Sequence, residues 1–257
     1  MSDIGAFVAL AERLADAARP IARRYFRSGL AIDAKPDASP VTAADREAEA
    51  AMRAIIEEAC PDHGIFGEEH GKTRLDSRHI WMLDPIDGTK AFVTGKPLFG
   101  TLIALLEDGR PIVGVIDAPA LEERWVGAAG RPTTHNGEPV QTRTCADIGT
   151  AWLYATTPHM FDGADHDAFD RLRGTCRDAV YGGDCYAYGL LANGTVDVVC
   201  EASMQPYDYC ALVPVVSGAG GVITDWQGQP LGLDSDGRVL AAGDATVHAA
   251  ARAALAG

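Results

Sequence analysis

An apolar run that leads directly into a turn with two carboxylates is the feature that most constrains the fold of this chain. Ile80-Trp81-Met82-Leu83 has the composition of a buried strand, and Asp84-Pro85-Ile86-Asp87-Gly88-Thr89 follows it without a break. The pattern predicts that Asp84 lies at the carboxyl end of the strand, where binding sites gather in α/β sheets. Asp-Pro and Asp-Gly also mark ordinary turns, so the turn alone leaves a structural and a functional interpretation open.

The same turn has the chemistry of a metal and phosphate site. Mg²⁺ prefers carboxylate oxygens, water and substrate phosphate as ligands, and Asp84 and Asp87 supply two carboxylates within one turn. Gly88 allows a ligand to approach the backbone closely. The N–H groups of Gly88 and Thr89 are expected to begin a helix, and a helix start binds phosphate.

Three further acids stand next to predicted elements. Glu68 follows a short apolar pair, which indicates the end of a neighbouring strand. Asp208 directly precedes a small and apolar helical pattern at 210–218, and Asp45 lies near the start of a helix that follows Thr42. The simpler interpretation is that Asp208 is a helix N-cap and that Thr42 and Asp45 form a capping pair.

Taken together, these segments resemble the inositol monophosphatase family of Mg²⁺-dependent phosphomonoesterases. The resemblance extends from about Asp3 to Trp226. It rests on four motifs in order, which are Pro-Val-Thr-x-x-Asp at 40–45, Gly-Glu-Glu at 67–69, Asp-Pro-Ile-Asp-Gly-Thr at 84–89 and an aromatic-Asp segment ending in Gly-Gly at 207–221. Tyr207 stands where many members carry Trp, and this departure leaves the following carboxylate in place.

The resemblance implies a Mg²⁺ cofactor of two or three ions held by oxygen ligands. Four acids and one backbone carbonyl supply the ligands of two ions: Glu68, Asp84, Ile86, Asp87 and Asp208. Glu68 and Thr89 are expected to orient and deprotonate the attacking water, and Asp45 to hold that water or a third ion. The N–H groups of Gly88 and Thr89 would hold the phosphate oxygens, and no covalent phosphoenzyme is needed.

A narrower resemblance, to the histidinol-phosphatase branch, appears at 181–189 and 196–201. Asp184 stands where inositol-specific members tend to carry a small residue. Asp184 and Glu201 are expected to accept charge-assisted hydrogen bonds from the ammonium and imidazole of L-histidinol phosphate. Asp87 and Asp208 are also expected to face the substrate. The predicted reaction is hydrolysis to L-histidinol and phosphate, a step of histidine biosynthesis.

Alternatives remain for this assignment. Asp184 and Glu201 could pair with an arginine or cap helices, and the substrate could be inositol-1-phosphate or another small phosphomonoester. A metal-binding regulatory protein without turnover is the alternative of another class, and the intact Glu68 and Thr89 pair argues against it.

Composition and charge limit the kinds of binding partner that the chain is expected to have. The 22 basic and 36 acidic residues give a net charge of −14, which argues against nucleic acid or an anionic membrane as partner. No apolar stretch approaches the roughly 20 residues of a membrane span, and the first residues lack the pattern of a signal peptide. A cytoplasmic protein with six reduced cysteines is therefore expected. Its seven histidines show no ligand spacing and are not expected to take part in the chemistry.

The order of patterns predicts two halves. Residues 1–145 combine two amphipathic helices with an antiparallel meander and carry most metal ligands, and residues 146–257 alternate strands and helices in α/β order. The family resemblance implies a layered α/β/α/β/α sandwich and a homodimer, whereas periodicity alone indicates only mixed α and β. The polar stretch at 70–80 is consistent with a surface loop, and a mobile lid over the phosphate is the alternative.

Overall fold

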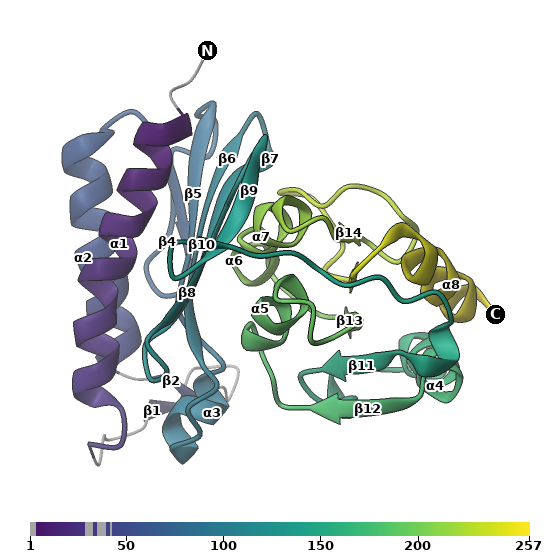
Figure 1. The fold of residues 1–257 in the computed structure, drawn as a ribbon. Helices are drawn as coiled ribbons and strands as arrows, with labels where there is room; N and C mark the ends of the chain where they lie inside the picture. Colours follow the sequence, from purple (N-terminus) through teal and green to yellow (C-terminus); the bar gives the residue numbers. More distant parts are fainter. Residues whose placement is uncertain (1–3, 29–32, 35–39, 42) are drawn as a thin grey trace.

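The chain folds into five layers of alternating helices and sheets. The computed structural model describes residues 4–28, 33–34, 40–41 and 43–257. Helices α1 and α2 cover one face of an eight-stranded sheet, helices α5, α6 and α7 lie between this sheet and a five-stranded sheet, and helices α4 and α8 cover the far face (Figure 1). The layered α/β/α/β/α sandwich expected from the family resemblance is thus confirmed.

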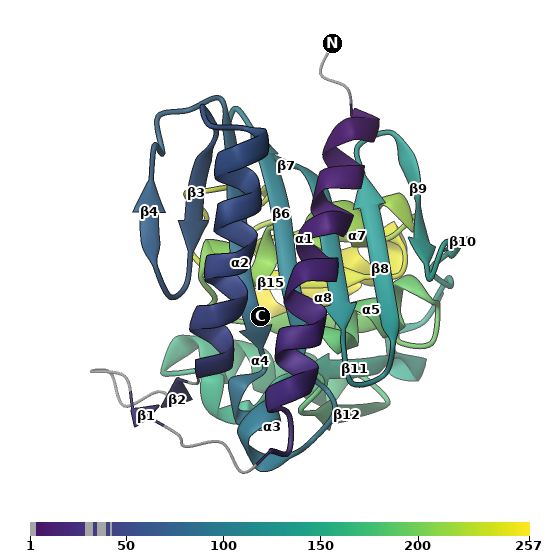
Figure 2. The same cartoon turned by 90° about the vertical axis from the view of Figure 1, so that its left-hand side faces the viewer.

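The first layer consists of α1 (Ile4–Tyr25) and α2 (Ala43–Ala59), which lie side by side across the outer face of the larger sheet (Figure 2). Both were expected from their amphipathic periodicity. Leu14 and Met52 on their inner faces are fully buried against sheet residues such as Trp81. The buried face of α2 also carries Asp45 and Glu49, two acids without contact to water.

The larger sheet has the strand order β10-β9-β8-β7-β6-β5-β3-β4. Its neighbours pair antiparallel except β3 and β5, which are parallel. The expected hairpin between β6 and β7 is confirmed, because Asp108 and Gly109 in its turn have the positive φ values of 49° and 76° that a tight hairpin requires. The strands are β3 (Gly64–Gly67), β4 (Gly71–Thr73), β5 (His79–Asp87), β6 (Gly100–Glu107), β7 (Arg110–Ala118), β8 (Glu123–Ala128), β9 (Arg131–His135) and β10 (Glu138–Pro139).

Strand β5 continues beyond the point at which the sequence predicts its end. Asp84 pairs with Leu102 of β6 and Asp87 pairs with Gly100, so one extra residue of β5 bulges between these pairs. Pro85 lies in this bulge, where its lack of an N–H group costs no ladder hydrogen bond. The prediction that the strand ends at Asp84 is therefore wrong, because a bulge allows the strand to pass through the acidic turn.

The smaller sheet has the order β12-β11-β13-β15-β14, in which β11 is parallel to β12 and β13 and the other pairs are antiparallel. The apolar runs at 152–155, 196–200, 222–224 and 239–242 predict four of these strands, and β12 is missed because its residues are largely exposed. The strands are β11 (Trp152–Ala155), β12 (Asp178–Tyr181), β13 (Val198–Glu201), β14 (Val222–Thr224) and β15 (Val239–Ala242).

The helices of the second half begin and end close to their expected positions, with two differences. The sequence pattern predicts a helix at 167–176, and α4 (Ala164–Thr175) begins three residues earlier. The pattern at 210–218 predicts a single helix that begins at Tyr209, but the structure has two helices there, α6 (Pro206–Tyr209) and α7 (Leu212–Gly218). The second half also contains α5 (Tyr186–Ala192), α8 (Ala245–Ala256) and two 3₁₀ turns at Ile148–Thr150 and Pro158–Met160, whereas α3 (Thr89–Thr94) belongs to the first half. A further two-stranded ribbon pairs β1 (Asp33–Ala34) with β2 (Pro40–Val41).

The two sheets share one core. The larger sheet spans residues 64–139 and the smaller one residues 152–242, on either side of the expected boundary between residues 145 and 146. Met82 and Trp125 of the larger sheet and Val199 of the smaller one belong to the same apolar cluster, together with Tyr188 of the helix layer between them. The division into halves at 145 stays a prediction.

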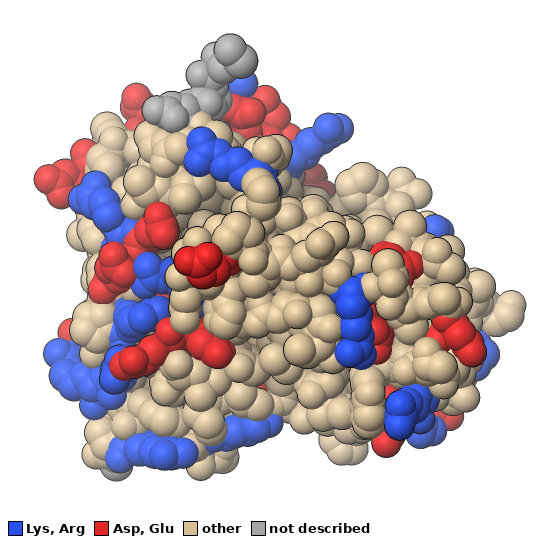
Figure 3. All heavy atoms as spheres, viewed as in Figure 1, with Lys and Arg blue, Asp and Glu red and all other residues tan. Residues whose placement is uncertain are grey.

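The remaining expectations concern the surface. The stretch at 70–80 begins with β4, which pairs with β3 as an edge strand, so its first part is not a loop. All six cysteines are free thiols, as expected. No described helix is long and apolar enough to cross a membrane. On the face shown in Figure 3, charges of both signs are interspersed around a largely uncharged middle.

Candidate active site

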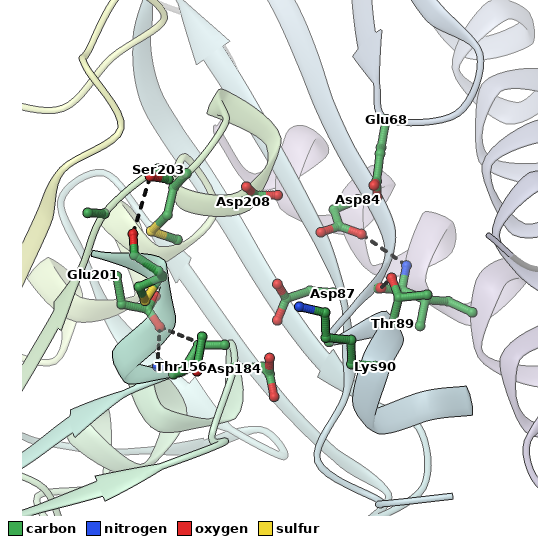
Figure 4. A pocket seen from close by; sticks show the side chains of 16 residues that line it. Glu68, Asp84, Asp87, Thr89, Lys90, Thr156, Asp184, Glu201, Ser203 and Asp208 are labelled. Carbon is green, nitrogen blue, oxygen red and sulfur yellow. Dashed lines mark hydrogen bonds between the residues drawn. The ribbon is translucent and has the colours of Figure 1, made fainter. Parts of the chain in front are cut away.

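A cavity of about 280 Å³ lies between the two sheets, and side chains from both halves line it (Figure 4). Every site residue expected from the sequence lines this cavity except Asp45. In Figure 4, Glu68, Asp84, Asp87 and Asp208 surround one part of the cavity, Glu201 lies beside Thr156 on the far side, and Asp184 lies next to Asp87. We call Asp184 and Glu201 the second acidic group.

Asp84, Asp87 and Asp208 form a metal-type cluster. Each offers a carboxylate oxygen, and these oxygens lie within 4.8 Å of one another. Burial raises the pKa of Asp84 and Asp208 well above the ordinary value, and repulsion from the neighbouring carboxylates adds to the effect. Burial likewise raises the pKa of Asp87 to about 6. A cluster of hard oxygen donors whose charges repel one another fits Mg²⁺, which would neutralise them.

The β5 bulge fixes the direction of its two acids. Asp84 Oδ1 accepts a hydrogen bond from the N–H of Ile86 at 3.0 Å, and the Thr101 hydroxyl donates to the carbonyl of Pro85 at 2.8 Å. Asp87 is held from the opposite half, because the N–H of Cys185 donates to its Oδ2 at 2.7 Å. The acidic turn is therefore rigid before any ligand arrives.

Helix α3 begins at the turn, as expected. Gly88 is its N-cap residue at a φ of 81°, a left-handed conformation that favours glycine. The Thr89 hydroxyl donates to the carbonyl of Ile86 at 3.2 Å. Both the carbonyl expected to bind metal and the hydroxyl expected to orient water therefore belong to one local hydrogen bond beside the cavity.

Asp208 both caps a helix and lines the cavity. Gln205 is the N-cap of α6, and Asp208 Oδ2 accepts a hydrogen bond from the Gln205 N–H at 2.7 Å. The interpretation of Asp208 as the N-cap is thus wrong in position, because Asp208 is the third helical residue and completes a capping box. One carboxylate oxygen serves the helix, and the metal-type cluster includes the same side chain.

Glu68 and Asp45 approach the cluster from β3 and α2. The N–H of Glu68 donates to the carbonyl of Leu83 at 3.1 Å, so the turn after β3 is tied to β5. Asp45 is 1% exposed, and its charge is among those that raise the pKa of Asp84, although it does not line the cavity. Thr42, its expected capping partner, lies outside the described residues.

Glu201, one of the two acids of the second group, already accepts hydrogen bonds from neighbouring residues of the protein. Glu201 accepts hydrogen bonds from the N–H and hydroxyl of Thr156 through Oε1 and from the Tyr188 hydroxyl at 2.9 Å through Oε2. Burial raises the pKa of Glu201 to about 7. Its partners are neutral donors, so the alternative of pairing with an arginine does not apply to Glu201.

Asp184 faces lysines rather than arginines. Burial and the nearby Asp87 raise its pKa to about 7, while the charges of Lys96 and Lys90 oppose this shift. The Lys96 ammonium itself donates to the carbonyl of Gly182. Asp184 and Lys90 both line the cavity, so a charged ligand there meets both signs.

Several lining residues were missed by the sequence analysis. Lys90 follows the acidic motif directly, and its position alone would have revealed it. The others follow the ends of β11 and β13, and the rule that sites gather at strand ends would have found them: Thr156, Thr157, Met160, Ala202, Ser203 and Met204. No described histidine lines the cavity, and the expectation that histidine takes no part in the chemistry stays a prediction.

Comparisons with known proteins agree on the family. The sequence model of the inositol monophosphatase family matches residues 5–256. The chain is 48% identical to the bifunctional phosphatase IMPL2, chloroplastic, of Arabidopsis thaliana, over 96% of this chain and 74% of that protein. It is 37% identical to a histidinol-phosphatase of Chlorobaculum parvum, over 90% of each. A solved inositol monophosphatase from Zymomonas mobilis superposes with a TM-score of 0.92 at 50% identity, over the whole of both chains.

Proposed function

The chain belongs to the inositol monophosphatase family and is a metal-dependent phosphomonoesterase of that family, and from this premise we propose that its substrate is L-histidinol phosphate. The observation that carries the proposal is that two further acids, Asp184 and Glu201, line the same cavity as the metal-type cluster, with Asp184 beside Asp87 and Glu201 on the far side (Figure 4). A phosphomonoester bound between the two groups would place its phosphate at one and its alcohol at the other.

The catalytic half of the proposal assigns a task to each residue of the β5 turn. Asp84, Asp87 and Asp208, with Glu68 and the Ile86 carbonyl, would hold Mg²⁺, which when bound supplies positive charge to the phosphate and lowers the pKa of a water.

The remaining steps belong to the chain's own groups. Glu68 and Thr89 orient the attacking water, and Glu68 accepts its proton. The N–H groups of Gly88 and Thr89 donate to the phosphate oxygens, and Asp45 adds its negative charge beside Asp84 from α2 without lining the cavity.

The recognition half concerns the alcohol. Histidinol carries an ammonium group and an imidazole that can be protonated, and both donate to carboxylates. Asp184 is partly buried at a cavity wall, where exclusion of water strengthens such a bond. Two of the relatives, from Chlorobaculum parvum and Mycobacterium tuberculosis, are named histidinol-phosphatases, which supports this choice.

Inositol-1-phosphate is the second candidate, and one observation favours it. Both oxygens of Glu201 already accept hydrogen bonds from Thr156 and Tyr188, which reduces its capacity to receive a cation. The 50% identical protein from Zymomonas mobilis is titled an inositol monophosphatase. A neutral polyol would suit a cavity in which Asp184 and Lys90 offset each other.

The deciding experiment is a comparison of kcat/KM for histidinol phosphate and inositol-1-phosphate with the purified chain in Mg²⁺, measured as phosphate release. We expect histidinol phosphate to be preferred and EDTA to abolish both activities. Preference for inositol-1-phosphate would reject the histidinol proposal and leave the phosphatase assignment intact. The expected homodimer stays a prediction, and sedimentation of the same preparation measures it.

A further inference from the structure

The turn that carries Glu68 rests on a buried carboxylate of α2. Glu49 is 0% exposed and lies one helical turn beyond Asp45 on the same face of α2. Its Oε2 accepts a hydrogen bond from the N–H of Glu69 at 2.7 Å, and its Oε1 accepts one from the N–H of His70 at 3.1 Å. Both donors follow Glu68 directly in the chain.

Two neighbours on α2 complete this contact. Arg53, one turn further along, donates through Nε to Glu49 Oε1 at 2.7 Å and also binds the carbonyl of Gly71. The His70 ring donates through Nε2 to the carbonyl of Arg46 at 3.0 Å. Side chains and backbone of α2 therefore hold every residue of the 69–71 turn.

The residue before Glu68 is a glycine, and its lack of a side chain leaves room for the Glu49 carboxylate. A Cβ atom on Gly67 would lie 2.0 Å from Glu49 Oε1, so only glycine lets the carboxylate approach this closely. On the other side, the N–H of Glu68 is fixed to the carbonyl of Leu83. The backbone of Glu68 is thus clamped between α2 and β5.

A buried ion pair is a poor way to gain stability, because well-packed apolar side chains of similar volume usually do as well or better. Glu49 and Arg53 form such a pair, with side chains 0% and 11% exposed. The pair has a clear use if the direction of the Glu68 side chain matters, since groups that hold metal ligands in place strongly affect metal binding.

We propose that Glu49 is a positioning residue for the metal site: its carboxylate sets the backbone of the 67–71 turn so that the Glu68 side chain reaches the ion held by Asp84 and its partners. The inference rests on the proposed function, because it requires that Glu68 bind Mg²⁺. It adds a residue that does not line the cavity and that acts only through the turn.

The test is calorimetric titration of the full-length chain with Mg²⁺ alone, at fixed pH and without substrate. Glu49→Gln keeps the shape of the side chain, but its amide has only one oxygen to accept the N–H groups of Glu69 and His70. The amide NH₂ group takes the place of the other oxygen and faces one of these N–H groups as a donor. We expect the Kd for Mg²⁺ to rise about tenfold to a hundredfold, the range seen when support of a metal ligand is removed. The kcat should fall more than KM rises.

Asp197→Asn is the matched control. Asp197 is 2% exposed, pairs with Arg143 and accepts from the N–H of Trp152 at 2.8 Å, but it lies away from the cavity. It should lose stability in a thermal melt and keep the wild-type Kd. Wild-type Mg²⁺ affinity in Glu49→Gln would overturn the positioning role and leave Glu49 as a structural residue.

Two further outcomes are decisive. If Glu49→Gln does not fold by circular dichroism, Arg53→Gln replaces it, because this variant leaves the Glu49 carboxylate in place and removes its cation together with the contact to the Gly71 carbonyl. A several-fold weaker Mg²⁺ affinity then supports the inference, and an unchanged one overturns it. A wild-type chain that binds no Mg²⁺ would overturn the proposed metal role and this inference with it.

Discussion

Asp184 has a backbone φ of 47°, in the left-handed region that asparagine and aspartate tolerate better than most residues. Asp184→Asn therefore removes the charge without straining the backbone. We expect kcat/KM for histidinol phosphate to fall about tenfold to a hundredfold, which is the value of one charge-assisted hydrogen bond. The substitution also removes the negative charge that faces Lys90 and Lys96. Inositol-1-phosphate serves as the control in the same assay. Equal losses for both substrates would show that Asp184 supports the site in general.

Thr89 separates water activation from phosphate binding. Its hydroxyl donates to the Ile86 carbonyl, and its N–H begins α3, so Thr89→Ala removes the first group and keeps the second. We expect kcat to fall roughly 10²–10⁴-fold with little change in KM, the size of a general acid–base contribution. Steady-state kinetics measure both constants. A raised KM with unchanged kcat would instead make the hydroxyl a phosphate ligand.

At the scale of elements, two glycines allow α7 to pack against the larger sheet. A Cβ atom on Gly114 of β7 would lie 2.0 Å from the carbonyl oxygen of Ala211, and one on Gly127 of β8 would lie 2.4 Å from the backbone of Pro214. Because α6 directly precedes α7, this close approach also fixes the distance between Asp208 and the β5 acids. Glycine in a strand often marks such a close backbone approach.

Gly114→Ala is accordingly expected to destabilise the chain by about 1–3 kcal/mol, the usual range for an overpacked core. Gly174, near the end of α4, has no atom within 4 Å of a built Cβ. The control Gly174→Ala should leave the free energy of unfolding unchanged or raise it by up to about 1 kcal/mol. Urea denaturation measures both variants, and equal stability would contradict the close packing of α7.

The whole molecule couples its stability to protonation of the cavity. The pKa of Asp87 is raised from 3.8 to about 6, and those of Asp184 and Glu201 to about 7. Raised values mean that the folded chain binds more protons than the unfolded chain between pH about 4 and 7, so the stability that these groups contribute is lost as pH rises through that range. At pH 8 the charged carboxylates of the cavity therefore lower the free energy of unfolding of the metal-free chain.

Mg²⁺ binds deprotonated carboxylates, so its stabilising effect should grow over the same pH range. We expect the increase in Tm on adding saturating Mg²⁺ to the EDTA-treated chain to be larger at pH 8 than at pH 5.5. Thermal melts at the two pH values, each with and without Mg²⁺, measure this difference. Asp87→Asn is the control and should show a smaller dependence on pH. An increase that is the same at both pH values would contradict a metal site in the acidic cluster.

The sequence by itself determined the elements whose pattern is long or strongly apolar. Helices α1 and α2 and the hairpin of β6 and β7 follow from local periodicity and turn chemistry, because each residue's burial repeats along its own element. It also determined the members of the acidic cluster, since their motifs are local. The short strands β9 and β12 were missed, because their partly exposed residues carry little apolar signal.

Only the tertiary structure decided which of these local features meet. The order of strands in a sheet and the packing of α7 bring a carboxylate oxygen of Asp208 to within 4.8 Å of one of Asp84. No periodic pattern in the sequence records such a contact. The bulge at Pro85, the neutral partners of Glu201 and the clamp of Glu49 on the Glu68 turn likewise depend on groups far apart in the chain. Local patterns report burial and turn geometry, whereas a site between two sheets is set by the packing of the whole molecule.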